Sequence, residues 1–301
     1  MALKLKDLPE DELLSMGSLS CSGCGQLLAF RHALKVLGKN TIVINSTGCL
    51  AVIMQMGVPK VPHFHVLFEN GPAVISGIDS ALRVMGKREG MNLLVAAGDG
   101  GTADIGIAAL SGAIERNQDF IYICFDNESY MNTGGQRSGT TPFGARTSTT
   151  PVGQVIRGEA RAPELRKNMV EIIAAHGTPY VASTSVGYPL DFMERVNKAM
   201  HTRGPSYIHC HTPCPPGWGI DTQDVIKVAQ LAVQTGFVKL YEIENGVRRI
   251  TKRIGKRKPV EEYLKYQARY KHILEDEDML AKVREDVAES SQLITQKEMS
   301  R

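Results

Sequence analysis

Five short apolar runs separated by helix-like segments are the feature that most limits the folds open to this chain. The apolar runs cover residues 41–46, 92–98, 119–125, 178–184 and 205–210. Segments with helical character lie at residues 25–37, 70–86, 103–116, 163–176, 189–202 and 221–235. Short apolar strands that alternate with helices are typical of a parallel sheet buried on both faces. The pattern therefore predicts an α/β fold in which helices cover both faces of a parallel sheet.

The character of the chain changes near its C-terminal fifth. Residues 1–240 contain the alternating pattern, and we expect them to form one domain. A basic run at 248–258 precedes a stretch rich in charge, so we expect residues 241–301 to be a C-terminal helical arm. The polar loop at 133–162 is long enough to be functional or disordered.

Composition excludes several classes of protein. The chain is 43% apolar and 22% charged, and its net charge of +3 is too small to argue for nucleic-acid binding. No apolar run approaches the roughly 18 residues of a membrane span, and the N-terminus has no apolar signal-peptide core. We therefore expect a cytoplasmic protein, in which six cysteines point to metal or redox chemistry and not to disulfides.

Glycines, a carboxylate and an amide follow two of the predicted strands. The sequence GDGG at 98–101 ends the run 92–98, and Asn127 follows the run 119–125. Strands of a parallel sheet bind ligands at their carboxyl ends. Mg²⁺ prefers oxygen ligands such as the Asp99 carboxylate and the Asn127 amide, while glycines let backbone N–H groups approach an anion. The combination predicts a site for Mg²⁺ and a diphosphate, whereas the alternative is a pair of ordinary turns.

Four of the six cysteines stand in loop-like contexts where side chains can converge. They are Cys21 and Cys24 in CSGC, Cys49 in STGCL and Cys214 in HTPCPPGWG. Cys124 lies inside an apolar run and is expected in the core. Cys210 competes with Cys214, which we favour because flanking prolines hold it in a rigid loop. Four thiolates suit Zn²⁺ or a [4Fe–4S] cluster, and spacing alone leaves these and plain thiols open.

Several motifs in order along the chain resemble one family. They are CSGCG, STGCL, HVLFENGPAV, GDGGTADIG, FDNESYMNTGGQ and PCPPGW, which span roughly residues 15–240. The 28-residue separation of Asp99 from Asn127 resembles the thiamine-diphosphate motif. Together these motifs resemble the β subunit of the 2-oxoacid:ferredoxin oxidoreductases of pyruvate synthase type, and the resemblance implies a thiamine-diphosphate-binding fold.

The resemblance also implies roles for individual residues. Cys21, Cys24, Cys49 and Cys214 would ligate a [4Fe–4S] cluster, and Asp99, Asn127 and the carbonyl of Ser129 would hold Mg²⁺. The residues implied around thiamine diphosphate are Gln26, Cys49, Gly98, Asp99, Gly100, Gly101, Asn127, Glu128, Ser129, Tyr130, Met131 and Asn132. Asn132 matches a position that reaches the 2-oxoacid, which makes it the expected catalytic residue. Gln26 stands where single-chain relatives carry a glutamate, so its role is open.

The implied reaction is the thiamine-dependent oxidative decarboxylation of pyruvate to acetyl-CoA and CO₂, or its reverse. Electrons would leave through the cluster to ferredoxin, and coenzyme A would take the acyl group. A branched-chain 2-oxoacid, phenylglyoxylate or oxalate are alternative substrates. A non-catalytic zinc-binding scaffold is the alternative from a different class of function.

Two parts that this family needs are missing from the sequence. The glutamate that activates thiamine sits on a pyrimidine-binding domain in the family, and we find neither that domain nor a ferredoxin-like CxxCxxC run. We therefore expect an α subunit with the pyrimidine-binding domain, γ and ferredoxin-like δ subunits or their fusions, and no activity of the chain alone.

Overall fold

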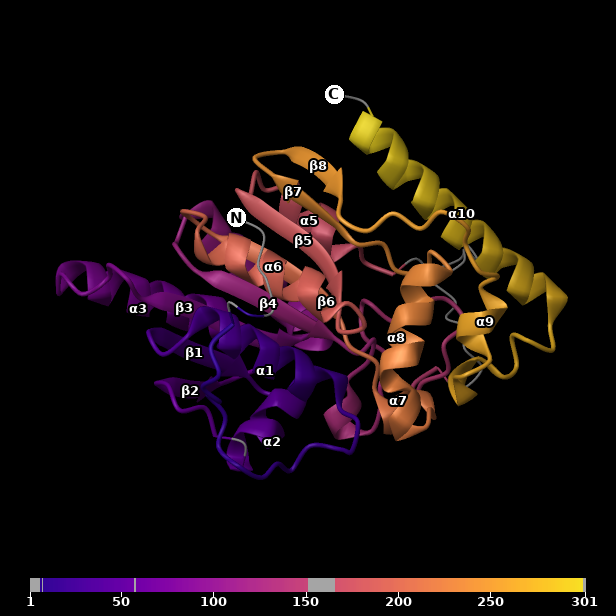
Figure 1. Cartoon of the computed structure of the whole chain (residues 1–301), viewed down its shortest axis with the longest axis horizontal. Helices are drawn as coiled ribbons and strands as arrows, with labels where there is room; N and C mark the ends of the chain where they lie inside the picture. The colour runs from indigo at the N-terminus through magenta and orange to yellow at the C-terminus, as the bar shows by residue number, and fades with distance from the viewer. Residues whose placement is uncertain (1–5, 7, 57, 151–165, 300–301) are drawn as a thin grey trace.

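An eight-stranded sheet forms the centre of the computed structural model, which describes residues 6, 8–56, 58–150 and 166–299. The strand order is β2-β1-β3-β4-β6-β5-β7-β8, and Figure 1 shows the helices packed around it. The strands are β1 (Thr41–Ser46), β2 (His63–Val66), β3 (Asn92–Gly98), β4 (Ile121–Asp126), β5 (Tyr180–Ser185), β6 (Ser206–His211), β7 (Tyr241–Glu244) and β8 (Val247–Ile250).

The pairing of the strands confirms the predicted α/β fold. β2, β1, β3, β4, β6 and β5 run parallel to their neighbours, and five of these six strands are the predicted apolar runs. β2 was not predicted as one of the runs, because it has four residues and two of them are histidines.

Beyond residue 240 the sheet continues into the segment expected to be a helical arm. β7 pairs antiparallel with β5, and β8 pairs antiparallel with β7. Asn245 and Gly246 join them with φ values of 49° and 79°, the left-handed conformation that two-residue hairpin turns require. The helical part of this segment therefore follows β8, and residues 241–250 complete the sheet.

Helices cover both faces of the sheet. On one face α1 (Gly25–Leu37), α2 (Cys49–Met56) and α6 (Pro189–Met200) bury a core that includes Phe30, Leu34 and Phe192. On the other face α3 (Gly71–Val84), α4 (Ile107–Glu115) and α5 (Met169–Ala174) bury Ile75 and Leu110 among others. Of the predicted helical segment 163–176, residues 166–176 contain the short α5, and residues 151–165 lie outside the described residues.

A third apolar cluster joins the C-terminal helices to the end of the sheet. It is built by α7 (Pro215–Trp218), α8 (Val225–Gln234), α9 (Glu261–Leu264) and α10 (Glu277–Met299), with Trp218, Tyr263 and Tyr270 fully buried within it. In Figure 1 these elements lie together at one side of the sheet. The C-terminal segment is therefore packed onto the domain.

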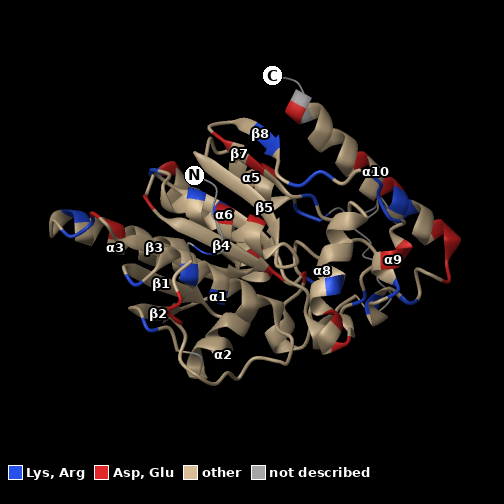
Figure 2. Cartoon of the chain, viewed as in Figure 1, with Lys and Arg blue, Asp and Glu red and all other residues tan. Residues whose placement is uncertain are grey.

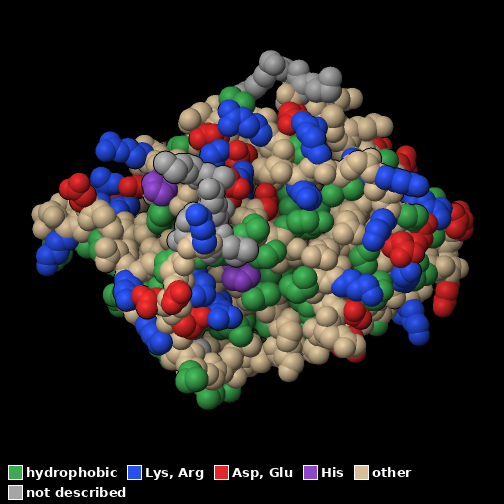
Figure 3. Space-filling view, in the orientation of Figure 1, with side chains coloured by type: hydrophobic (Ala, Val, Ile, Leu, Met, Phe, Trp, Pro, Cys, Tyr) green, Lys and Arg blue, Asp and Glu red, His purple; other side chains and the backbone are tan. Residues whose placement is uncertain are grey.

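Charged side chains of both signs are interspersed over the molecule (Figures 2 and 3). On the face drawn in Figure 3, apolar side chains are exposed between them. Among the helices of the described residues, none combines the length and hydropathy needed to cross a membrane.

Candidate active site

The GDGG sequence lies where β3 turns into the helical layer. β3 ends at Gly98, and one π-helical turn (Gly101–Ile105) leads into α4. A Cβ atom on Gly100 would lie 2.3 Å from the ring of Tyr130, so glycine is required for this close approach. The Thr102 hydroxyl donates to the Gly98 carbonyl at 2.7 Å and closes the turn. A π-helical turn is rare and often occurs at functional sites.

Asp99, Asn127 and Ser129 converge because β3 and β4 are neighbours in the sheet, with Gly98 opposite Phe125. One terminal atom of the Asn127 amide lies 3.1 Å from Asp99 Oδ1 and 2.7 Å from the Ser129 carbonyl oxygen. If that atom is the amide nitrogen, it donates to both oxygens, and the amide oxygen accepts from Gln26 Nε2 at 3.0 Å. If it is the oxygen, it lies beside two further oxygens, and oxygens are the ligands that a hard cation prefers. A cation there would favour the second orientation, so these residues fit Mg²⁺.

The Asp99 carboxylate is almost fully buried in a polar cage. Burial, and secondarily the nearby Asp126 carboxylate, raise the pKa of Asp99 well above its usual range. Hydroxyls of the polar loop oppose this, because Ser138 Oγ donates to Asp99 Oδ2 at 2.5 Å and Thr140 Oγ1 donates to the same oxygen at 3.0 Å. A divalent cation would favour the ionised carboxylate. The hydroxyls of the cage thus satisfy Asp99 Oδ2, while Asp99 Oδ1 is directed at Asn127.

Glu128 lies between Asn127 and Ser129 in the sequence, but its side chain points away from both. Its φ of +64° is unusual for a residue with a side chain, and such strain persists only when the surroundings hold it. The Glu128 amide donates to Asp126 Oδ1 at 2.8 Å, and its carbonyl accepts from Thr141 Oγ1 at 2.6 Å. Its carboxylate, fully buried, accepts from Arg269 Nη2 at 2.5 Å.

Arg269 and Trp218 support the same loop from the C-terminal side. The Arg269 guanidinium lies 3.7 Å from the centroid of the Trp218 ring and stacks on it. Trp218 Nε1 donates to the Asn127 carbonyl at 2.8 Å. The segment beyond residue 240 therefore fixes the backbone that carries Asn127 and Ser129.

The four loop cysteines line one cavity of about 70 Å³. Cys21 and Cys24 lie in the turn before α1, Cys49 begins α2, and Cys214 directly precedes α7. Burial, and secondarily neighbouring thiols, raise the pKa of Cys49 to about 12 and that of Cys214 to about 11. Cys124 and Cys210 are fully buried in β4 and β6 and do not line this cavity.

The arrangement of these thiols differs from a site for one metal ion. Four thiolates around a single zinc stand about 2.3 Å from the metal, and hence close to one another. No group of three or more metal-ligating side chains in the described part of the chain, which includes all four cysteines, could hold a single ion. The four thiols line one cavity, as a polynuclear cluster held by four cysteines also requires.

The cysteine cavity adjoins a cavity at the GDGG turn. The second cavity, of about 30 Å³, is lined by residues of 98–101 and 127–133. Gln26, Cys49, Asn127 and Asn132 line both. Cys49 and Asn132 also line a more open cavity of about 800 Å³ that contains the side chain of Arg146. Asn132 thus lies where the three cavities meet.

The structure brings together all but one of the residues expected around the cofactor. The cavity at the GDGG turn is lined by Gln26, Cys49, Gly98, Asp99, Gly100, Gly101, Asn127, Ser129, Tyr130, Met131 and Asn132. The side chain of Glu128 lies outside it, because its carboxylate is directed at Arg269. Sequence reasoning missed Thr47, Gly48, Phe68, Ser138 and Thr140, of which only the STG stretch after β1 offered a signal.

Comparison with known proteins identifies relatives of this chain. Residues 23–210 match the family described as thiamine pyrophosphate enzyme, C-terminal TPP binding domain. Pyruvate synthase subunit PorB of Methanothermobacter thermautotrophicus is 53% identical over 273 residues, which cover 90% of this chain and 93% of that protein. Ketoisovalerate oxidoreductase subunit VorB of Pyrococcus furiosus is 43% identical over 279 residues, which cover 90% and 89%.

A solved structure shows the same fold. It is 2-oxoglutarate:ferredoxin oxidoreductase from Magnetococcus marinus with 2-oxoglutarate, coenzyme A and succinyl-CoA bound, with a TM-score of 0.57 and 23% identity over 74% of this chain and 82% of that one. The extent of the sequence identity confirms the resemblance seen in the motifs. The chain therefore belongs to the 2-oxoacid:ferredoxin oxidoreductase β subunits of pyruvate synthase type, a family of thiamine-dependent enzymes.

Proposed function

We propose that this chain is the β subunit of an enzyme that converts pyruvate and coenzyme A to acetyl-CoA and CO₂, or catalyses the reverse, with electrons passing through a [4Fe–4S] cluster to ferredoxin. One observation carries the proposal. The cavity lined by four cysteines and the cavity at the GDGG turn share Gln26, Cys49, Asn127 and Asn132. A cluster and a thiamine cofactor in these cavities would be neighbours, as electron transfer between them requires.

The first cofactor would be thiamine diphosphate with Mg²⁺. The metal would be held by the Asp99 carboxylate, the Asn127 amide oxygen and the Ser129 carbonyl, whose convergence supports this assignment. Bound thiamine supplies the chemistry that cleaves the bond between a keto carbon and its carboxylate. The chain's own part is to orient the diphosphate with the 98–101 turn and to stabilise the ionised form of Asp99 with the Ser138 and Thr140 hydroxyls, which oppose the rise in its pKa.

The second group would be a [4Fe–4S] cluster on Cys21, Cys24, Cys49 and Cys214. The cavity that these four cysteines share supports this assignment. Burial of the cluster and hydrogen bonds to its sulfurs would tune its potential. The non-catalytic zinc scaffold therefore remains only as an outcome of the metal analysis below.

Asn132 and Arg146 are the residues that we assign to substrates. Asn132 is exposed at the junction of the three cavities and can donate a hydrogen bond to the carbonyl of a 2-oxoacid. Arg146 faces the open cavity of about 800 Å³, where a guanidinium can bind a carboxylate or phosphate oxygen.

The chain would act within a larger assembly in the cytoplasm. The pyrimidine half of thiamine and its activating glutamate would come from an α subunit, and electrons would pass to ferredoxin through a ferredoxin-like δ subunit, with γ completing the complex. The six free cysteines suit a reducing compartment. The relatives named as subunits PorB and VorB support a multi-subunit enzyme.

The test is anaerobic viologen reduction by the native complex, with pyruvate and with or without coenzyme A. Reduction that needs both supports the proposal. A rate only with a branched-chain 2-oxoacid, as the name of the VorB relative would fit, replaces the substrate and keeps the site. A rate without coenzyme A rules out acyl transfer in this form and favours an oxalate-type reaction.

A matched pair of variants connects the activity to the site. Asp99→Asn keeps the shape of the side chain but removes the charge, and we expect activity and Mg²⁺-dependent thiamine binding to be lost. Asp221→Asn changes an exposed carboxylate at the 3₁₀ turn before α8 and should leave both unchanged. Zinc in place of iron in the native complex would support the scaffold alternative.

A further inference from the structure

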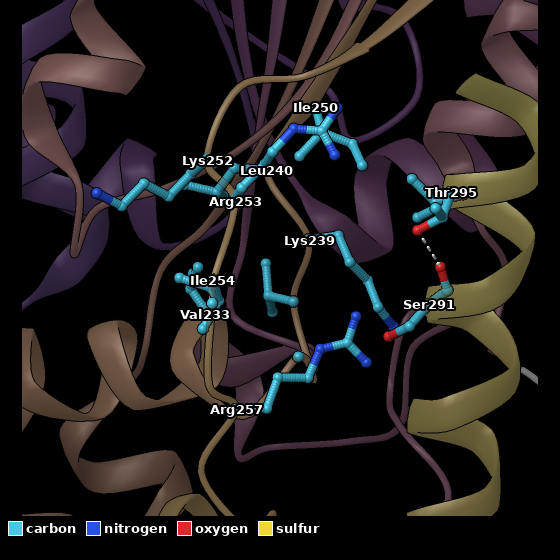
Figure 4. A pocket seen from close by; sticks show the side chains of 14 residues that line it. Val233, Lys239, Leu240, Ile250, Lys252, Arg253, Ile254, Arg257, Ser291 and Thr295 are labelled. Carbon is cyan, nitrogen blue, oxygen red and sulfur yellow. Dashed lines mark hydrogen bonds between the residues drawn. The ribbon is translucent and has the colours of Figure 1, made fainter. Parts of the chain in front are cut away.

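A cavity of about 350 Å³ lies in the C-terminal part of the molecule, between the end of α8, the 250–257 segment and α10 (Figure 4). Among the described residues it shares no lining side chain with the cofactor or cysteine cavities. Its size falls in the range of about 300–1,000 Å³ that is usual for small-molecule sites. Neither the proposed reaction nor the comparisons give it a role.

Four cationic side chains line this cavity, and in the described part of the chain only Arg253 among them forms an ion pair. Arg253 pairs with Glu298 at 2.6 Å, and Lys252 lies 5.6 Å from the centroid of the Tyr188 ring. Lys239 donates to the Ser290 hydroxyl, which carries no charge. Arg257 has no carboxylate within ion-pair distance among the residues that the structure describes. Lys239 and Arg257 are thus the cations available to a ligand.

The two free cations converge on the same part of the cavity. In Figure 4 the head groups of Lys239 and Arg257 both reach toward Ser291 on α10, whereas Lys252 extends away from them. Gly236 makes room for this arrangement, because a Cβ atom there would come within 3.3 Å of the Arg257 side chain. The Lys258 amide donates to the Gln234 carbonyl at 3.1 Å and anchors the segment that carries Arg257 to α8.

The surroundings of Lys239 disfavour its positive charge. Burial, and then the charges of Arg166 and Arg257, lower the pKa of Lys239 to about 7, while Asp286 opposes this shift. A cation held under these conditions gains free energy from an anion placed beside it. The remaining wall is apolar and includes Val233, Leu240, Ile250 and Ile254.

We propose that this cavity binds a small phosphate-bearing anion, with its phosphate between Lys239 and Arg257 and its less polar part against the apolar wall. The planar guanidinium fork of Arg257 and the ammonium of Lys239 suit a phosphate, because together they offer several donors and two positive charges. The hydroxyls of Ser291 and Thr295 already donate to carbonyls of α10, so the two cations carry the recognition.

The test is calorimetric titration of the native complex, saturated with thiamine diphosphate and Mg²⁺ so that the cofactor site is filled. The probes are inorganic pyrophosphate and ADP at pH 7, in two buffers of different ionisation enthalpy. We expect binding with net proton uptake, since an anion beside Lys239 raises the pKa of its ammonium. Tighter binding of ADP identifies a nucleotide-like ligand, whereas equal binding identifies the phosphate group alone.

Three variants test whether anion binding depends on Arg257 and Lys239. Arg257→Gln changes an exposed side chain, and it should weaken binding at least about tenfold. Lys239→Met should weaken binding and abolish proton uptake. Lys256→Gln removes a neighbouring exposed charge that does not line the cavity and should change neither. No binding by the native complex, or equal binding by Arg257→Gln, overturns the proposal.

Discussion

Replacing Arg269 by methionine should loosen the loop that carries Asn127 and Ser129. Arg269 is 5% exposed and its partner Glu128 is 0% exposed, so the change leaves a buried carboxylate without its main counter-charge. Methionine keeps much of the side-chain length and can still contact the Trp218 ring. The perturbation therefore tests the charge and the hydrogen bond more than the packing.

The expected loss of unfolding free energy follows from the burial of the ion pair between Arg269 and Glu128. Removing one partner of a buried ion pair costs about 3–5 kcal/mol. Arg166, whose Nη1 lies 3.5 Å from Glu128 Oε1, retains part of the compensation. Loss of the guanidinium from the Trp218 face adds to the cost. We therefore expect Arg269→Met to lower the free energy of unfolding by about 3–4 kcal/mol.

The assay uses the chain's only tryptophan, Trp218, which lies beside the loop. Its fluorescence during urea unfolding should report the lowered midpoint, and titration should show a weaker Mg²⁺-dependent affinity for thiamine diphosphate, on the order of tenfold. The double variant Arg269→Met/Glu128→Gln should recover part of the stability, because it leaves no buried charge unpaired. Lys265→Met breaks an exposed pair with Glu262 and should cost at most about 0.5 kcal/mol.

Two results would refute this reasoning. One is a loss below about 1 kcal/mol for Arg269→Met, which would mean that water or Arg166 compensates Glu128 fully. The other is a double variant as unstable as the sum of the single changes, which would mean that the two charges do not act as a pair. Burial raises the pKa of Glu128, so the cost should also shrink as the pH is lowered, because a protonated Glu128 has no charge left unpaired.

Three further predictions concern the cluster and its surroundings. Cys214→Ser should lower the iron content of the native complex measured by metal analysis, whereas Cys210→Ser, buried in β6, should leave it unchanged. Burial lowers the pKa of His211 to about 3, so the folded chain loses stability as the pH falls from about 6.5 toward 3. In this pH range His211→Phe should reduce the slope of unfolding free energy against pH by up to about 1.4 kcal/mol per pH unit. Trp218→Phe leaves the Asn127 carbonyl without its donor and should cost about 1–3 kcal/mol in urea unfolding followed by circular dichroism.

Much of the fold was readable from local patterns. The runs at β1, β3, β4, β5 and β6 were predicted because each is a short, continuous apolar stretch between helices. The hairpin of β7 and β8 was missed, although Asn245 and Gly246 form the dipeptide that a two-residue turn prefers. The hairpin was not predicted because each strand has four residues and β8 contains two arginines, which give the stretch the charged character of a surface segment.

The candidate site could be predicted from the sequence where its residues directly follow predicted strands. Asp99 follows β3 and Asn127 follows β4, and neighbouring parallel strands must bring their carboxyl ends together. Family motifs added the cysteines, which local propensity cannot bring to one cavity. The hydroxyl cage of Ser138 and Thr140 had no such signal, because these residues lie in a polar loop whose path depends on what it packs against.

The sequence by itself determined the strand and helix pattern, the glycines that let Tyr130 approach the GDGG turn, and the chemical types available at each strand end. These properties depend on residues close together in the chain, where periodicity and backbone preference act. Only the tertiary structure decided that Glu128 turns from the cofactor cavity toward Arg269, which lies 141 residues further along. Such a contact depends on how the C-terminal segment packs on the sheet, and hence on the whole fold, because a buried charge must find its partner wherever the chain can supply one.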